Sequence, residues 1–78
     1  MPSLRRDFGH RLKAVRLDRK LTQEEFAELV GISVDFLSLI ERGINAPSFE
    51  VLERMADKLD LQVRELFDFR KPVRTGGR

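Results

Sequence analysis

Two short segments of this chain carry side chains of the kinds that contact phosphates and base edges. Thr22 and Gln23 open one predicted helix, where backbone N–H groups and the positive end of the helix dipole favour an anion. The start of the next predicted helix offers hydroxyls, valine methyls and a carboxylate, which can contact bases in a major groove. These base-reading candidates are Ser33, Val34, Asp35 and Ser38. In the helix-turn-helix layout described below, these residues would face the major groove of double-stranded DNA.

The base-reading candidates lack Arg, Lys, Asn and Gln, so bidentate recognition of guanine or adenine is not available to them. Val34 suits a thymine methyl group, Asp35 can accept from a cytosine amino group, and Ser38 can contact either base of a pair. An acid in the first turn of a helix is also favoured by the dipole alone, so Asp35 has a purely structural alternative. Part of the specificity would then come from DNA shape.

Residues 22–42 are expected to form two helices joined by a tight turn. Thr22 and Glu25 have the spacing of a reciprocal capping box, and Ser33 is a good N-cap for the second helix. Gly31 can adopt the positive φ that ends a helix abruptly. The apolar positions that would pack the two helices together are Phe26, Ala27, Val30, Leu37 and Ile40. This is the layout of a helix-turn-helix, and the alternative is a helical hairpin without a binding function.

The remaining segments predict three more helices and no strands, which gives an all-α, five-helix fold. The first helix spans about Leu4 to Arg19, and the last is a short one around Val63 to Phe67. Gly43 ends the third helix, and Ser48 caps a fourth whose inward positions are Val51, Leu52, Met55, Ala56 and Leu59. Residues 1–69 are expected to form one domain, and residues 70–78 a basic, disordered tail.

The charge of this 78-residue chain is unevenly distributed, although the net value is only +2. Residues 1–20 hold seven basic and two acidic groups, residues 21–69 hold four and eleven, and residues 70–78 hold four and none. Basic residues at both ends can neutralise phosphates. The alternative is that these charges only solvate a helix and a loose tail.

Other classes of function receive little support from the composition. The single histidine, His10, has no acid or nucleophile arranged around it, so we expect no enzyme. The absence of cysteine excludes disulfides and thiolate metal sites, and we expect no metal and no small-molecule cofactor. Apolar runs are too short for a membrane span and the N-terminus lacks a signal-peptide pattern. The expected location is the cytoplasm, with nucleoid association when DNA is bound.

The order of several motifs resembles the Cro/CI-type helix-turn-helix transcriptional regulators, known as the XRE family. The resemblance covers roughly Phe8 to Phe67. Beyond the helix pair, the matching stretches are Leu12–Arg16, Leu21–Glu24, Ile40–Gly43 with Pro47-Ser48, and Leu61–Phe67. It implies a compact lambda-repressor-like domain that controls promoters as a homodimer on a pseudo-palindromic site, with the third helix in the major groove.

The resemblance also implies roles for residues outside the two segments described first. Arg16 and Glu41 would form a salt bridge between the first and third helices, the alternative being two unrelated surface charges. Arg16 could also present its remaining guanidinium donors to a phosphate. Backbone and side-chain donors from Arg42 to Asn45 would hold the neighbouring DNA strand. The expected phosphate contacts are thus Arg16, Thr22, Gln23, Arg42 and Asn45.

The chain departs from the family pattern at three helix ends. Family members usually carry glycine where this chain has Lys20 and Asp60, and we expect a modest loss of stability there. Gln62 is a poor N-cap where the family tends to have Ser or Thr, so the last helix is the least secure element.

The C-terminal end holds more apolar side chains than a small core obviously needs. Val63, Phe67 and Phe69 are the expected dimer interface, whereas Leu59, Leu61 and Leu66 are expected to close the monomer core. An alternative function also follows from this surface. The domain could be antitoxin-like, or another protein-binding module of the same fold whose main partner is a protein.

Overall fold

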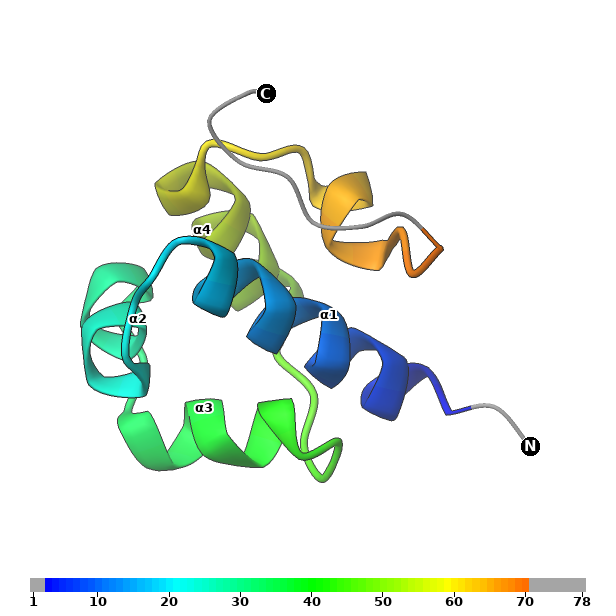
Figure 1. Cartoon of the computed structure of the whole chain (residues 1–78), viewed down its shortest axis with the longest axis horizontal. Coiled ribbons are helices and arrows are strands. Elements are labelled where there is room, and N and C mark those ends of the chain that lie inside the picture. The colour runs from blue at the N-terminus through cyan, green and yellow to red at the C-terminus, as the bar shows by residue number, and fades with distance from the viewer. Residues whose placement is uncertain (1–2, 71–78) are drawn as a thin grey trace.

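The computed structural model describes residues 3–70, and these residues form four α-helices and one 3-10 helix (Figure 1). The elements are α1 (Leu4–Asp18), α2 (Gln23–Val30), α3 (Val34–Glu41), α4 (Phe49–Leu59) and the 3-10 helix η1 (Val63–Phe67). No strand occurs within residues 3–70. An all-helical fold is therefore confirmed, and the expected disordered tail lies almost wholly outside the described residues.

The fifth α-helix expected from the sequence is instead the single 3-10 helix η1. The Gln62 side chain makes no cap hydrogen bond. Its backbone N–H donates to the Glu65 carboxylate at 2.9 Å, and its carbonyl accepts the Glu65 N–H at 2.9 Å. A segment of only five residues gains too few i to i−4 hydrogen bonds to propagate an α-helix.

Side-chain caps begin the three central helices as predicted. Thr22 and Glu25 form the reciprocal box, with Glu25 N–H donating to Thr22 Oγ1 at 3.0 Å and Thr22 N–H donating to Glu25 Oε1 at 2.9 Å. Ser33 accepts from the Phe36 N–H at 3.0 Å, and Ser48 caps α4 in the same way. Helix starts were therefore readable from local sequence.

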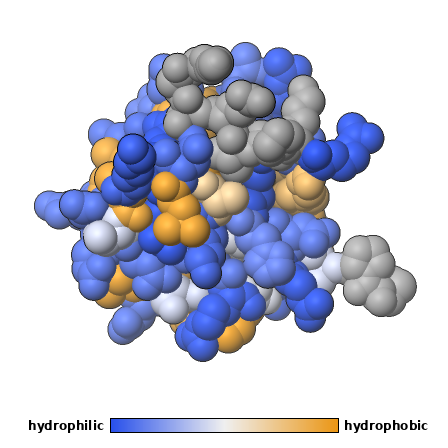
Figure 2. Space-filling model, viewed as in Figure 1, coloured by the Kyte–Doolittle hydropathy of each residue, from blue (hydrophilic) through white to orange (hydrophobic). Residues whose placement is uncertain are grey.

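The hydrophobic core lies where α1, α2, α3, α4 and η1 meet. The predicted inward residues of α2 and α3 are all buried, as are Leu59 and Leu66. On α1, the buried apolar residues are Phe8, Leu12 and Val15. Val51 and Leu61 are half-buried and pack against the edge of the core. Hydrophilic side chains cover most of the face shown in Figure 2, and apolar ones appear there only in small patches.

Gly9 is the place where α1 comes closest to α3. A Cβ atom at this position would overlap the carbonyl oxygen of Ile40 and lie 2.8 Å from that of Glu41. Both neighbours are backbone atoms, which cannot rotate away. Close packing of α1 on α3 thus requires glycine at position 9, a requirement that we did not predict from the sequence.

Two residues without glycine's freedom adopt left-handed backbone conformations, as expected from the departures noted above. Lys20 has φ 61° after α1, and Asp60 has φ 56° after α4. The same conformation at Gly31 and Gly43, both with φ 78°, carries no such cost.

We expect Lys20→Gly to raise the free energy of unfolding by about 0.5–1 kcal/mol, because the steric cost of left-handed backbone exceeds the entropy that glycine adds to the unfolded chain. Asp60→Gly should gain less, since Asp tolerates this region better. Urea denaturation measures both changes. Lys58→Gly, inside α4, is the control and should lose about 1 kcal/mol. A loss of stability in Lys20→Gly would contradict the strain argument.

Candidate nucleic-acid interface

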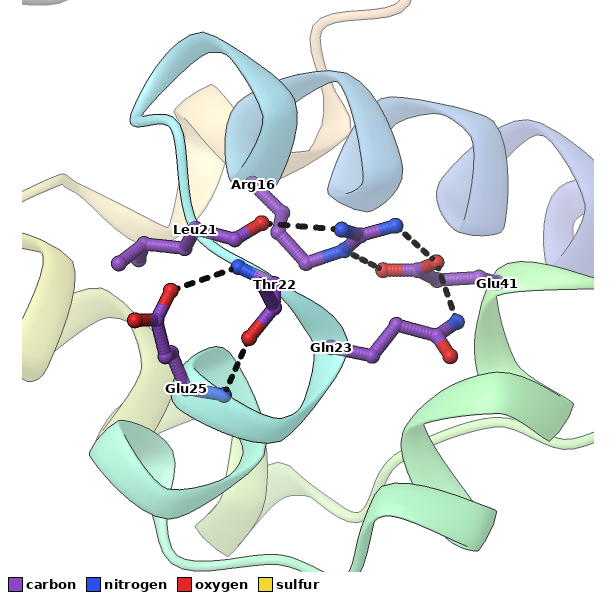
Figure 3. Close-up of polar contacts among 6 residues, drawn as sticks. All are labelled: Arg16, Leu21, Thr22, Gln23, Glu25 and Glu41. Atoms are coloured by element: carbon purple, nitrogen blue, oxygen red, sulfur yellow. Dashed lines mark hydrogen bonds and ion pairs between the residues drawn. The ribbon is translucent and has the colours of Figure 1, made fainter.

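A polar cluster of Arg16, Gln23 and Glu41 joins α1, α2 and α3, with Arg16 and Glu41 buried (Figure 3). The Arg16 guanidinium faces the Glu41 carboxylate in a bidentate pair, with Nε to Oε2 at 2.7 Å and Nη2 to Oε1 at 3.0 Å. Arg16 Nη1 also donates to the Leu21 carbonyl at 3.0 Å, and Gln23 Nε2 donates to Glu41 Oε1 at 3.0 Å. The pair implied by the resemblance is present, and Gln23 is an addition that sequence reasoning missed.

The cluster gives Arg16 a structural role, because most of its guanidinium donors are bound within the chain and are not available to DNA. Arg16 is only 7% exposed, and three of the five N–H groups of its guanidinium are already bound within the chain. A direct phosphate contact by Arg16 is therefore not supported. Its effect on binding would be indirect, through the angle at which α1 holds α3.

The start of α2 has fewer free donors than the sequence suggested. The Thr22 N–H is bound by Glu25, although the Thr22 hydroxyl accepts its cap bond and keeps its own proton. Gln23 uses one amide N–H on Glu41. What remains for a phosphate is the Thr22 hydroxyl, the second Gln23 amide proton and the backbone N–H groups of Gln23 and Glu24, because the Glu25 N–H already donates to Thr22 Oγ1.

The predicted base-reading residues occupy the first two turns of α3 but are unequally available. Ser33 and Asp35 are exposed, and Ser38 is half-buried. Val34 is half-buried because it packs against the core. Ser33 accepts the Phe36 cap bond and retains its O–H as a donor. The surface offered to a groove is thus small, acidic at Asp35 and without a forked donor.

The loop after α3 corrects one expectation directly. All four backbone N–H groups from Arg42 to Asn45 are bound within the chain, including those of Ile44 and Asn45, which share the Leu39 carbonyl at 2.9 and 3.3 Å. The loop closes the end of α3 with these groups and has none left for a phosphate. Only the exposed Arg42 guanidinium and the half-buried Asn45 amide could contact the DNA backbone here.

The arrangement of a capped α2, a left-handed glycine and an outward-facing α3 matches a known family over most of the chain. The family model HTH_3, described as a helix-turn-helix, matches residues 12–66. The chain belongs to this helix-turn-helix family. The resemblance to XRE-type regulators is thereby confirmed.

Relatives and solved structures of the HTH_3 family carry regulatory names. The chain is 42% identical over 59 residues to the uncharacterized HTH-type transcriptional regulator YazB of Bacillus subtilis, which covers 76% of this chain and 86% of YazB. It is 46% identical over 55 residues to the immunity repressor protein of Bacillus phage phi105, covering 70% of this chain and 38% of the repressor. The restriction-modification controller protein C.AhdI of Aeromonas hydrophila superposes with a TM-score of 0.77 at 35% identity, covering 81% and 96% of the two chains.

The three residues expected at a dimer interface do not share one environment. Val63 is 40% exposed and Phe69 is 39% exposed. Phe67 is half-buried and packs against the core, with its ring centroid 5.0 Å from that of Phe8 and 6.2 Å from that of Phe69. Phe67 therefore contributes to the monomer core, whereas Val63 and Phe69 are exposed large apolar side chains at this end.

Arg54 is a further residue that the sequence did not single out. From α4, its Nε donates to the Val30 carbonyl at 2.7 Å and its Nη2 to the Gly31 carbonyl at 3.3 Å. These carbonyls end α2, where a cation is also favoured by the dipole. Arg54 thus braces the turn between the two helices of the family motif.

Within residues 3–70, no helix is long and apolar enough to cross a membrane, and no three His, Cys, Asp or Glu side chains lie together as a metal site would require.

Proposed function

We propose that this chain is a sequence-specific, double-stranded-DNA-binding transcriptional regulator that places α3 in the major groove. The observation that carries the proposal is the exposed start of α3, a helix joined to α1 and α2 by the buried Arg16–Glu41 pair and the half-buried Gln23. A rigid helix with polar groups at its N-terminal end is what a helix-turn-helix presents to base edges. The names of the relatives support the same function.

Contacts to the DNA backbone would set the register of the domain. Thr22 and Gln23 would hold one strand from the start of α2, and the side chains of Arg42 and Asn45 would hold the other. Asp35 and Ser38 would read bases, with Ser33 and the exposed edge of Val34 beside them. The protein would act without a cofactor, in the cytoplasm and on the nucleoid, and would not be an enzyme.

A dimer would supply the second half-site contact. One such helix reaches only a few base pairs, and two-fold related helices are needed about 34 Å apart on a pseudo-palindromic operator. We propose that Val63 and Phe69, with the exposed edge of Phe67, form the contact between protomers.

Titration of the protein onto the duplex from upstream of its own gene, beside a shuffled duplex of equal composition, tests the proposal. We expect preference for the native duplex and affinity that falls as salt rises. Equal, weak binding to both duplexes would contradict it as a regulator of its own gene. It would favour the alternative, a protein-binding module of the same fold.

Two classes of variant should separate the contacts to DNA phosphates from the contacts to bases. Arg42→Ala is expected to weaken binding to both duplexes alike and to reduce the salt slope by about 1. Ser38→Ala and Asp35→Ala should instead change the preference between duplexes, by about 1–3 kcal/mol for a base pair that is read. If all three variants lowered both affinities equally, α3 would not be the reading element. Glu28→Ala, at an exposed position on α2, is the control.

A further inference from the structure

The first turn of α1 packs against the loop that follows α3, two segments far apart in sequence (Figure 1). Arg5 Nη1 donates to the Ile44 carbonyl at 3.4 Å. A Cβ atom on Gly43 would lie 3.0 Å from the Arg6 Cα atom, so the loop touches the backbone of α1 directly. The loop that carries Arg42 and the start of α1 are therefore one continuous surface.

This surface is basic. Arg5, Arg6 and Arg42 are all exposed, and Asp7, the one acidic residue in the first turn of α1, is half-buried. Arginines at the start of a helix oppose its dipole, which favours acids there. Contact with the loop uses the backbone and Cβ atom of Arg6 and one of the five N–H groups of Arg5, and it leaves the Arg6 guanidinium unused. The stability of the fold therefore gives no reason for two cations at this place.

We propose that Arg5 and Arg6 extend the phosphate-binding surface of the α3–α4 loop, so that the start of α1 holds a DNA phosphate next to the one held by Arg42. The inference rests on the proposed function and adds a contact from α1 to it. Guanidinium groups fit phosphate oxygens with paired donors, and both side chains start beside the loop that would track the strand. The contact would not depend on the DNA sequence, because phosphates are the same at every base pair.

A charge-reversal pair tests this contact on a duplex of random sequence, for which no operator need be known. Arg5→Glu with Arg6→Glu should weaken binding roughly 10-fold at about 0.1 M salt and lower the magnitude of the salt slope by about 1–2. The matched control is Lys58→Glu with Arg64→Glu. Both control residues are exposed, on α4 and on η1, and η1 lies on the side of α1 away from α3 in Figure 1. The control pair makes the same change in net charge and should keep the wild-type slope.

Thermal melting distinguishes a loss of DNA contacts from a loss of fold stability. Acids at the start of α1 suit the dipole, so the Arg5→Glu, Arg6→Glu protein should melt no lower than wild type while binding more weakly. Arg5→Lys with Arg6→Lys keeps the charges and should keep the slope. Salt slopes that are equal in the charge-reversal and control pairs would overturn the α1 contact and leave the proposed function standing. A wild-type protein that binds no duplex would overturn both.

Discussion

Glu41→Ala is expected to lower the free energy of unfolding by about 3–5 kcal/mol, the loss typical when one partner of a buried ion pair is removed. The Arg16 guanidinium would stay buried at 7% exposure without its carboxylate, and the Gln23 amide would lose its acceptor as well. The free energy of unfolding of a domain of this size is roughly 5–15 kcal/mol, so this variant would lose a large part of it. Urea denaturation followed by circular dichroism measures it.

Two further variants define what the Glu41 result means. Glu28→Ala removes a carboxylate from an exposed site on α2 and should change stability by no more than about 0.5 kcal/mol. The double variant Arg16→Met, Glu41→Leu removes both charges and should be less damaging than Glu41→Ala alone, because no buried charge is left unpaired. A loss for Glu41→Ala as small as that for Glu28→Ala would show that the cluster is not buried in solution.

Gly9→Ala is expected to destabilise the protein by about 2–3 kcal/mol, a sign opposite to the usual effect of alanine in a helix. Alanine within a helix ordinarily gains about 1 kcal/mol over glycine. Here the added methyl group would meet the carbonyl oxygens of Ile40 and Glu41, so α1 must move away from α3 or α3 must bend.

Thermal or urea unfolding decides the sign of the Gly9 effect. His10→Ala, at the exposed neighbouring position, is the control and should be nearly neutral. If Gly9→Ala melted at or above the wild-type temperature, α1 and α3 would lie farther apart than the structure places them.

The features that sequence predicted correctly are those decided within a few residues. Thr22 and Ser33 cap helices because their hydroxyls meet N–H groups three residues later, and Gly31 ends α2 through its own backbone freedom. Such signals are local, so one sequence is enough to read them.

The features that sequence missed depend on contacts between distant segments. Gly9 looks like a poor helix residue until α3 is set against it, and Arg54 looks like a surface charge until α4 lies beside the end of α2. The bound N–H groups of the loop from Arg42 to Asn45 were missed because they close the end of α3. The 3-10 character of η1 was missed because five residues are too few for hydrophobic spacing to distinguish a 3-10 helix from an α-helix.

The separation of the buried cluster from the exposed start of α3 has an evolutionary consequence for the proposed regulator. Ser33 is committed to capping α3 and Val34 to packing on the core, so changes at either would disturb the fold. Asp35 is exposed and Ser38 is half-buried, and the cluster involves neither side chain. Descendants of this gene could therefore acquire new operators by drift at Asp35 and Ser38 while the scaffold beneath them stayed under purifying selection.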